Sequence, residues 1–166
     1  MSTSSISPPS ALWDPSDPNA RTPVMLASDL DDALHATLYD LLVDEGYHVC
    51  VPRDPAEGMA LLRTGECGAI LITPLPPESA VSPHSWIAAL AAAQSSEPLI
   101  ALRLRKHCAL IGLASGMAVH ENGFVAFSPL WDRLMTRWRA TLNVPCDLDA
   151  LIHAIATASQ RLKSAA

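Results

Sequence analysis

Long apolar runs are missing from this 166-residue chain. Its apolar stretches are broken by Arg, His, Pro or Gly well before the roughly 20 residues that a membrane-spanning helix needs. The first residues are rich in Ser and Pro, and they lack the basic start and apolar run of a signal peptide. These absences exclude a membrane span and a secretory signal, so we expect a cytoplasmic protein that makes no membrane contact.

Paired cysteine motifs are missing as well. The four cysteines are scattered, with no C-x-x-C pair and no histidine at zinc-finger spacing: Cys50, Cys67, Cys108 and Cys146. We expect four reduced thiols that are mostly buried, with a disulfide or a metal site as the alternatives. Cys146 is expected to be a structural thiol, and no metal site is expected.

Two signatures of catalysis and cofactor binding are also absent. No Ser or Cys lies in a G-x-S-x-G elbow. The residues that follow the first apolar run, ASDLDD, contain no glycine-rich phosphate loop. We therefore expect no catalytic residue, no enzymatic activity and no cofactor.

The composition that remains is that of a globular protein, with 49% apolar and 17% charged residues. The net charge of −6 is unevenly placed, because residues 1–100 hold 3 basic and 13 acidic side chains whereas residues 101–166 hold 8 basic and 4 acidic ones. That asymmetry suits a protein partner or self-association. The basic side chains are too dilute to predict nucleic-acid binding.

The chain is expected to divide into a leader and one domain. Residues 1–21 are dominated by Ser, Pro, Asp and Asn, and this composition predicts a flexible leader before a domain at 22–166. Trp13 is the exception in the leader. It either docks onto the domain or a partner, or it stays solvated.

Strands are expected where short apolar runs end at turn residues. These runs are 23–28, 47–51, 69–73, 98–102 and 140–144. Helices with leucine-patterned or low-polarity sequences lie between them, beginning at Asp31 or Asp32, at the capping box Asp54–Glu57, at Ser82 and at Asp147. A further helix is expected in LWDRLMTRW, after Ser128-Pro129. This alternation predicts right-handed βαβ units and a parallel sheet.

The combined spacing of four segments resembles the receiver domain of bacterial response regulators. The segments are DLDDALHATLYDLLVDEGYHV at 29–49, DPAE at 54–57, ILITPLPP at 70–77 and VPCDLDALIHAI at 144–155. The resemblance covers roughly residues 22–103 and 140–163. It implies a flavodoxin-like, CheY-like α/β fold with a doubly wound five-stranded parallel sheet in the order 2-1-3-4-5, and with an enlarged segment between strands 4 and 5, at about 104–139.

The same resemblance implies that the phosphorylation site is degenerate. A receiver needs an acceptor aspartate after its third strand, two acids that hold Mg²⁺, a Thr or Ser after the fourth strand and a Lys after the fifth. Carried over residue by residue, the acceptor falls on Thr73, the Thr/Ser position on Arg103 and the lysine on Val144, while Asp29 is the one acid that survives. Arg103 is expected either to pair with Asp29 or to point to solvent.

A surface for protein partners is expected in the enlarged segment, because receivers commonly bind partners through this region. Trp and Arg dominate interface energetics, and the candidates are Trp131, Arg133, Met135, Arg137 and Trp138. The alternative is that this apolar stripe belongs to the core.

We therefore expect a non-phosphorylatable, pseudo-receiver type of interaction module in bacterial signal transduction or transcriptional regulation. Its partner would be a signalling protein, or a second copy of the chain in a homodimer. The competing hypothesis is a flavodoxin-like domain that binds a nucleotide or flavin at the same sheet edge, against which stands the missing glycine-rich loop.

Overall fold

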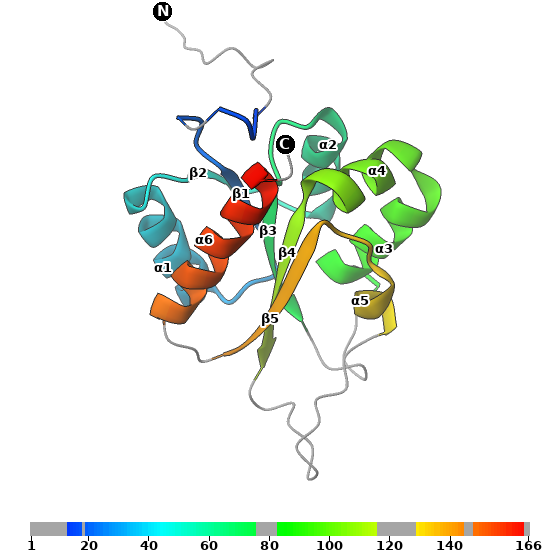
Figure 1. Ribbon diagram of the computed structural model, residues 1–166. Coiled ribbons are helices and arrows are strands. Elements are labelled where there is room, and N and C mark those ends of the chain that lie inside the picture. The colour runs from blue at the N-terminus through cyan, green and yellow to red at the C-terminus, as the bar shows by residue number, and fades with distance from the viewer. Residues whose placement is uncertain (1–12, 18, 76–82, 116–128, 145–147, 165–166) are drawn as a thin grey trace, which may run out of the picture.

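The computed structural model describes residues 13–17, 19–75, 83–115, 129–144 and 148–164. Strands and helices alternate along these residues (Figure 1). The strands are β1 (Pro23–Leu26), β2 (His48–Cys50), β3 (Ile70–Leu75), β4 (Ala109–Ser115) and β5 (Trp138–Val144). The helices are α1 (Asp32–Asp44), α2 (Pro55–Thr64), α3 (Trp86–Ser96), α4 (Pro98–His107), α5 (Pro129–Arg133) and α6 (Leu148–Ser164).

The strands form one parallel sheet in the order β2-β1-β3-β4-β5. Helices α1 and α6 cover one face, and α2 to α5 cover the other (Figure 1). The central strands are buried on both sides, which is why their sequences read as continuous apolar runs. The predicted fold class and strand order are confirmed.

Side-chain caps begin the first two helices where the sequence predicted them. The Asp31 carboxylate accepts the N–H of Leu34 at 3.2 Å, and that of Asp54 accepts the N–H of Glu57 at 2.8 Å. Helix α2 ends at Gly65, whose φ of 78° is in the left-handed region and whose N–H bonds back to the last turn. The helix ends in this half of the chain are therefore set by residues close in sequence, which is why they could be predicted.

The expected fourth strand at 98–102 is wrong, because these residues open helix α4. A short apolar run does not by its pattern distinguish a strand from a buried helix, and Pro98 at the first helical position suits a helix. Ile100 and Leu104, four residues apart, supply the buried face of α4. The true fourth strand, β4, begins 11 residues further along the chain and pairs with β3 from Ala109 onward.

The expected helix over LWDRLMTRW is also shorter than predicted. Helix α5 ends at Arg133, and Trp138 begins β5. Gln94 of α3 holds the turn between them, since its side chain accepts the N–H of Met135 at 2.7 Å and donates to the carbonyl of Arg133 at 3.0 Å. The expected insertion at 104–139 thus comprises the end of α4, β4, α5 and the start of β5, with 116–128 outside the described residues.

Strand β3 continues two residues past Thr73 even though its next residue is a proline. The carbonyl of Ile72 accepts the N–H of Ala27 on the β1 side, so by alternation Pro74 presents its nitrogen on that same side. The register of β1 against β3 stops at Leu26 and Ile72. The missing N–H of Pro74 therefore faces a position where β1 no longer pairs with β3, so no hydrogen bond of the sheet is lost.

One aromatic side chain joins several elements on the α2–α5 face. Trp86, the first residue of α3, is fully buried. A Cβ placed on Gly58 of α2 would lie 2.2 Å from its ring and 3.4 Å from the sulfur of Met25. Glycine at position 58 is thus what lets the indole enter between α2 and β1.

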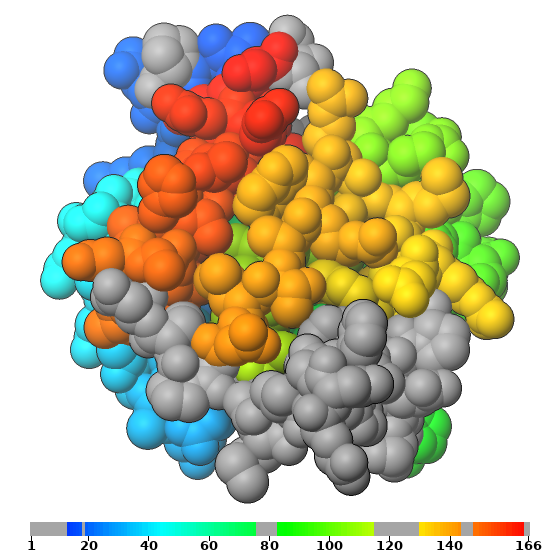
Figure 2. All heavy atoms as spheres, turned by 60° about the horizontal axis from the view of Figure 1, so that its bottom comes forward, coloured from blue at the N-terminus to red at the C-terminus, as the bar shows by residue number. Residues whose placement is uncertain are grey.

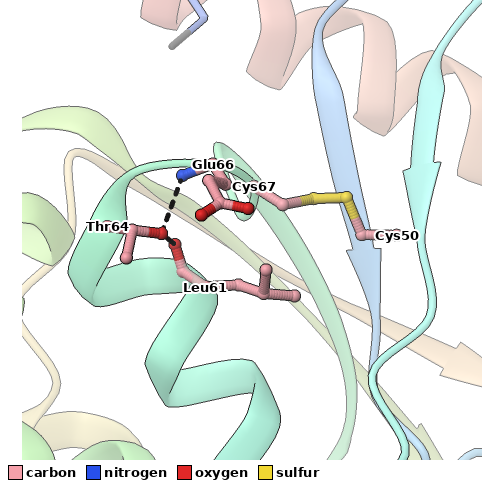
Figure 3. Close-up of a disulfide and its surroundings, with 5 residues drawn as sticks. All are labelled: Cys50, Leu61, Thr64, Glu66 and Cys67. Atoms are coloured by element: carbon pink, nitrogen blue, oxygen red, sulfur yellow. Dashed lines mark hydrogen bonds between the residues drawn. A yellow bond between two sulfur atoms is a disulfide. The ribbon is translucent and has the colours of Figure 1, made fainter. Parts of the chain in front are cut away.

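A disulfide joins Cys50, the last residue of β2, to Cys67, which precedes β3 (Figure 3). The expectation of four reduced thiols is therefore wrong for this pair, because the fold brings two cysteines 17 residues apart to a Cα–Cα distance of 6.6 Å. Closing a loop of this size contributes about 3 kcal/mol in the chain-entropy model. Cys108 is a buried free thiol, and Cys146 lies outside the described residues.

Trp13 takes the docked alternative, since it is partly buried and packs against the core. Around it, Ser16 and Asn19 donate their N–H groups to the carboxylates of Asp14 and Asp17, each at 2.9 Å. Residues 1–12 of the expected leader lie outside the described residues. Among the helices that the structure describes, none combines the length and the apolar character needed to cross a membrane.

The contact between Gly58 and Trp86 predicts that Gly58→Ala destabilises the protein. In an unobstructed helix this change would stabilise by about 1 kcal/mol. Here the new methyl group overlaps the indole, and we expect a net loss of about 1–3 kcal/mol in the free energy of unfolding, measured by urea denaturation. In a Trp86→Phe background, which removes the far end of the indole, the same change should cost less. A cost that is equal in both backgrounds would contradict the assignment.

Candidate functional site at the carboxyl edge of the sheet

The carboxyl ends of the parallel strands meet at the lower edge of the sheet in Figure 1, and Figure 2 turns this end toward the viewer. In open α/β sheets this edge is where ligands and chemistry collect. Three of the four predicted site residues belong here: Asp29 follows β1, Thr73 lies near the end of β3, and Val144 ends β5. The fourth, Arg103, does not.

The loop after β1 binds the start of helix α3. Asp29 accepts the N–H of Trp86 in a long hydrogen bond of 3.4 Å, and the Ser28 hydroxyl accepts the indole N–H of Trp86 at 2.9 Å. The backbone N–H of a helix's first residue has no partner inside the helix, so this carboxylate supplies one. Both side chains of the loop are thus engaged by the same buried tryptophan.

The electrostatics of Asp29 follow from this position. Desolvation raises the pKa of its carboxyl above the usual aspartate value of 3.8, and the hydrogen bond from Trp86 opposes the rise. Asp29 is nevertheless exposed on its outer side. Its charged form is therefore slightly disfavoured by folding, which is the reverse of what a carboxylate beside a cation would show.

Thr73 is fully buried within β3, where it pairs with Gly112 of β4. Its hydroxyl donates to the carbonyl of Pro74 at 3.2 Å. A hydroxyl in this position satisfies its own donor locally and has no solvent-exposed surface. Thr73 is thus a packed polar residue of the sheet, and it does not mark the strand's last position as the sequence suggested.

The last residue of β5, Val144, pairs with Ser115 at the end of β4. Because β4 occupies 109–115, the residue at the end of the fourth strand is Ser115, and the sequence analysis missed it by assigning strand 4 to 98–102. The signal was present: LIGLAS, like ILIT, is an apolar run that ends in a hydroxyl residue. Both side chains lie outside the described ones.

Arg103 is placed wrongly by the sequence prediction. It lies on α4, and its guanidinium packs against Gly65 at the end of α2, 2.7 Å from where a Cβ on that glycine would be. The residues around it precede β3 and β4, so Arg103 is at the amino-terminal edge of the sheet. The expected pairing of Arg103 with Asp29 is therefore excluded by the packing of α4.

The predicted interaction residues divide into core and surface. Trp131 is only 4% exposed and belongs to the core, where Gly112 of β4 leaves room for its ring. The guanidinium of Arg139 lies 5.4 Å from that ring and donates to the carbonyls of Trp131 and Leu134. Trp138 is partly buried in β5.

Three of the predicted residues do lie at the surface, and Met135 is 58% exposed. Arg133 and Arg137 are exposed beside it. Figure 2 shows the yellow-to-orange residues of α5 and β5 between α6 and the green residues of α3 and α4. The exposed part of the predicted interaction surface is therefore smaller than expected, because one of its tryptophans is buried and the other is partly buried.

The chemistry available at the carboxyl edge is limited. Asp29 is a single carboxylate, and the part of the chain that the structure describes contains no group of three or more His, Cys, Asp or Glu side chains placed to hold a metal ion. Mg²⁺ sites that support phosphoryl transfer combine carboxylates with other oxygen ligands. The loop after β1 at this edge bonds to helix α3 of the same chain instead.

Comparison with known proteins identifies the fold. A response regulator receiver domain protein from Methanospirillum hungatei JF-1 superposes with a TM-score of 0.59 at 15% identity, over 88% of this chain and 98% of its own. A response regulator receiver protein from Pseudomonas putida does so with a TM-score of 0.57 at 19% identity, over 83% and 98%. An adenylate cyclase structure from Rhodopirellula baltica also superposes, with a TM-score of 0.57 at 13% identity, over 86% and 90%. No family model and no curated protein sequence matches the chain.

The fold is therefore that of response-regulator receiver domains, as the sequence resemblance implied. Within this fold, the loop after β1 holds Trp86 through the side chains of Ser28 and Asp29.

Two substitutions of Asp29 separate its charge from its hydrogen bond. Asp29→Ala removes the acceptor for the Trp86 N–H and should lower the free energy of unfolding by about 1 kcal/mol, as the loss of a helix-terminal acceptor does. Asp29→Asn retains an acceptor and should leave the stability at neutral pH unchanged or slightly higher. Urea unfolding of both variants at pH 7 measures the difference.

The pH dependence of the same pair has a definite sign. Because the folded-state pKa of Asp29 is raised, the unfolded chain loses this proton first as the pH rises. The wild type should therefore lose stability relative to Asp29→Asn as the pH rises from 3.8 through the raised pKa. A relative gain over that window would mean that a cation stabilises Asp29.

Proposed function

We propose that this chain is a phosphorylation-independent, receiver-like module that acts in signal transduction by binding another protein. The observation that best supports this proposal is the contact between the loop after β1 and Trp86. Where a receiver, in the resemblance drawn above, would hold Mg²⁺ with two acids, this chain has Ser28 and Asp29 bound to Trp86. The fold supports a signalling role, and the altered edge supports a mechanism without phosphoryl transfer.

The residues at the acceptor and sensing positions support the same mechanism. The acceptor position holds the fully buried Thr73, whose hydroxyl bonds to a backbone carbonyl. A threonine phosphate would also be an ester, chemically unlike the acyl phosphate that an aspartate forms. At the end of β5, Val144 has no cation to offer a phosphoryl group.

A basic surface beside β5 is our candidate for the partner site. It combines the last turn of α4 with the residues around β5, because the N–H of Arg137 bonds to the carbonyls of Leu104 and Cys108 at 3.2 and 2.9 Å. We define this basic surface by its exposed members: Arg105, Lys106, Arg133, Met135, Arg137 and Arg139.

The chemistry of the basic surface suits a partner with an acidic face and a small apolar contact for Met135. The chain itself carries exposed acidic residues at both ends of α1: Asp31, Asp32, Asp44 and Glu45. Because α1 contacts β2, at the sheet edge opposite β5, self-association through these charges would be head to tail.

No described contact at the carboxyl edge supports the flavodoxin-like alternative. A nucleotide or flavin phosphate would need free backbone N–H groups in the loop after β1. In that loop the N–H groups of Ala27 and Leu30 donate to backbone carbonyls, and the side chains of Ser28 and Asp29 bond to Trp86. We therefore do not propose cofactor binding at this edge, nor an enzymatic activity.

Phosphodonor treatment tests the mechanism. Incubation of the protein with acetyl phosphate and Mg²⁺ should leave its intact mass unchanged, because the acceptor position is a buried threonine and the edge offers one carboxylate. A receiver that retains its acceptor aspartate, treated in parallel, is the positive control. Stoichiometric addition of a phosphoryl group to Thr73, located by peptide mapping, would refute the proposal.

Charge reversal tests the partner site. The double variant Met135→Glu, Arg137→Glu should abolish self-association in sedimentation experiments, and capture of a partner from the native cell, while leaving the circular dichroism and melting temperature nearly unchanged. The matched control is Val51→Glu, Arg53→Glu, which alters an exposed apolar and an exposed basic residue that belong neither to the basic surface nor to the acidic residues of α1. Binding that survives the first pair, or is lost equally with the second, would contradict the assignment.

A further inference from the structure

A cavity of about 180 Å³ opens at the edge of the sheet opposite the candidate site. Its walls come from residues that precede or begin strands, such as Pro23, Cys67 and Cys108, and from the end of α2 and the last turns of α4. Trp13 and Pro15 close it from the segment before β1, which Figure 1 shows above the sheet. The cavity therefore lies at the opposite edge from Asp29 and Thr73, and it shares the last turn of α4 with the basic surface but none of the side chains that define that surface.

Two residues of the cavity wall carry buried N–H donors without an acceptor. The indole nitrogen Nε1 of Trp13 and the guanidinium nitrogen Nε of Arg103 are both shielded from solvent, and neither has a hydrogen-bond partner among the described residues. They are the two buried side-chain nitrogen or oxygen atoms of the described chain with this property. Buried donors are nearly always satisfied, so two unpaired donors on residues of one cavity wall indicate a missing acceptor.

The charge around the cavity selects the kind of acceptor. Arg103 carries a permanent positive charge, and no described aspartate or glutamate lines the space. Burial raises the pKa of the Cys108 thiol to about 12, against an opposing effect of Arg103, so this wall is neutral at physiological pH. A protein with a net charge of −6 has thus placed an uncompensated cation beside a cavity, which suits an anionic oxygen.

The remaining walls are apolar, so they favour an apolar body for the rest of the ligand. Pro15, Pro23, Leu62 and Ala69 line the cavity together with the Trp13 ring. A cavity of about 150 Å³ in a protein core is large enough for benzene. The space here therefore accommodates one ring or a branched chain in addition to the hydrogen-bonding oxygens.

We propose that this cavity binds a small organic monocarboxylate with an apolar body, whose carboxylate accepts from Arg103 Nε and Trp13 Nε1 and whose body packs against the prolines, Leu62 and Ala69. Gly65 is needed for this site, because a side chain there would meet the Arg103 guanidinium. The bound acid would fix Trp13 against the domain, so the site would couple a metabolite to the segment that precedes β1. This inference is independent of the proposed partner surface.

Benzoate is the probe, and the indole N–H signals of the four tryptophans in a proton–nitrogen NMR spectrum are the readout. The Trp13 signal is assigned by its loss in Trp13→Phe. We expect saturable benzoate binding that shifts the Trp13 signal strongly and raises the melting temperature. Benzamide, which keeps the ring without the charge, and inorganic phosphate, which keeps charge without the ring, should each bind at least about tenfold more weakly.

Arginine variants provide the matched comparison. Arg103→Gln should weaken benzoate binding by about tenfold or more, and Arg103→Lys, which keeps the charge without the Nε donor, should fall between it and the wild type. Arg53→Gln, which changes an exposed arginine before α2 that is outside both the cavity lining and the basic surface, should bind as the wild type does. If Arg103→Gln does not fold, Trp13→Phe removes the other donor and is followed by melting temperature instead.

Four results would overturn the proposal. An unchanged Trp13 signal and melting temperature in the presence of benzoate would mean that water satisfies both donors. Equal binding of benzamide would show that charge is not recognised, and equal binding of phosphate would show that the apolar walls are not used. Equal weakening by Arg103→Gln and Arg53→Gln would place the anion outside the cavity.

Discussion

The burial of Trp86 is the constraint on which the rest of the described edge depends. Its ring enters between α2 and β1 because position 58 is glycine. Its indole N–H and backbone N–H then require acceptors, since buried donors without partners are costly. Ser28 and Asp29 supply them. One aromatic residue thereby fixes the start of α3, the position of α2 and the conformation of the loop after β1.

This use of the loop carries a functional consequence. In the receiver pattern the same loop contributes acids to a metal site, and a hydrated metal needs carboxylates that are free to coordinate it. Here Asp29 of the loop bonds to a helix terminus, and Thr73 at the acceptor position on β3 is packed inside the sheet. Because the receiver fold is retained while these two residues make structural contacts, we propose that the protein works by binding another protein and not by phosphoryl transfer.

The two edges of the sheet are used in opposite ways. At the carboxyl edge the described polar groups of β1 and β3 are satisfied by the protein itself. At the amino-terminal edge a cavity is lined by two residues that carry buried donors without acceptors, and its cation comes from α4, the helix that the sequence did not predict. Arg103, which the resemblance assigned to the carboxyl edge, thus lies at the opposite edge, where the resemblance placed no function.

The sequence by itself determined the caps of α1 and α2, because an Asp cap acts over only a few residues, and it determined the fold class and strand order through its resemblance to receiver domains. It did not determine whether Pro98–Leu102 was strand or helix, because a short apolar run suits both until β4 occupies its place in the sheet. It also left open the pairing of Cys50 with Cys67 and the burial of Trp131. Only tertiary structure decided these, together with the place of Arg103, because each depends on which distant segments pack together.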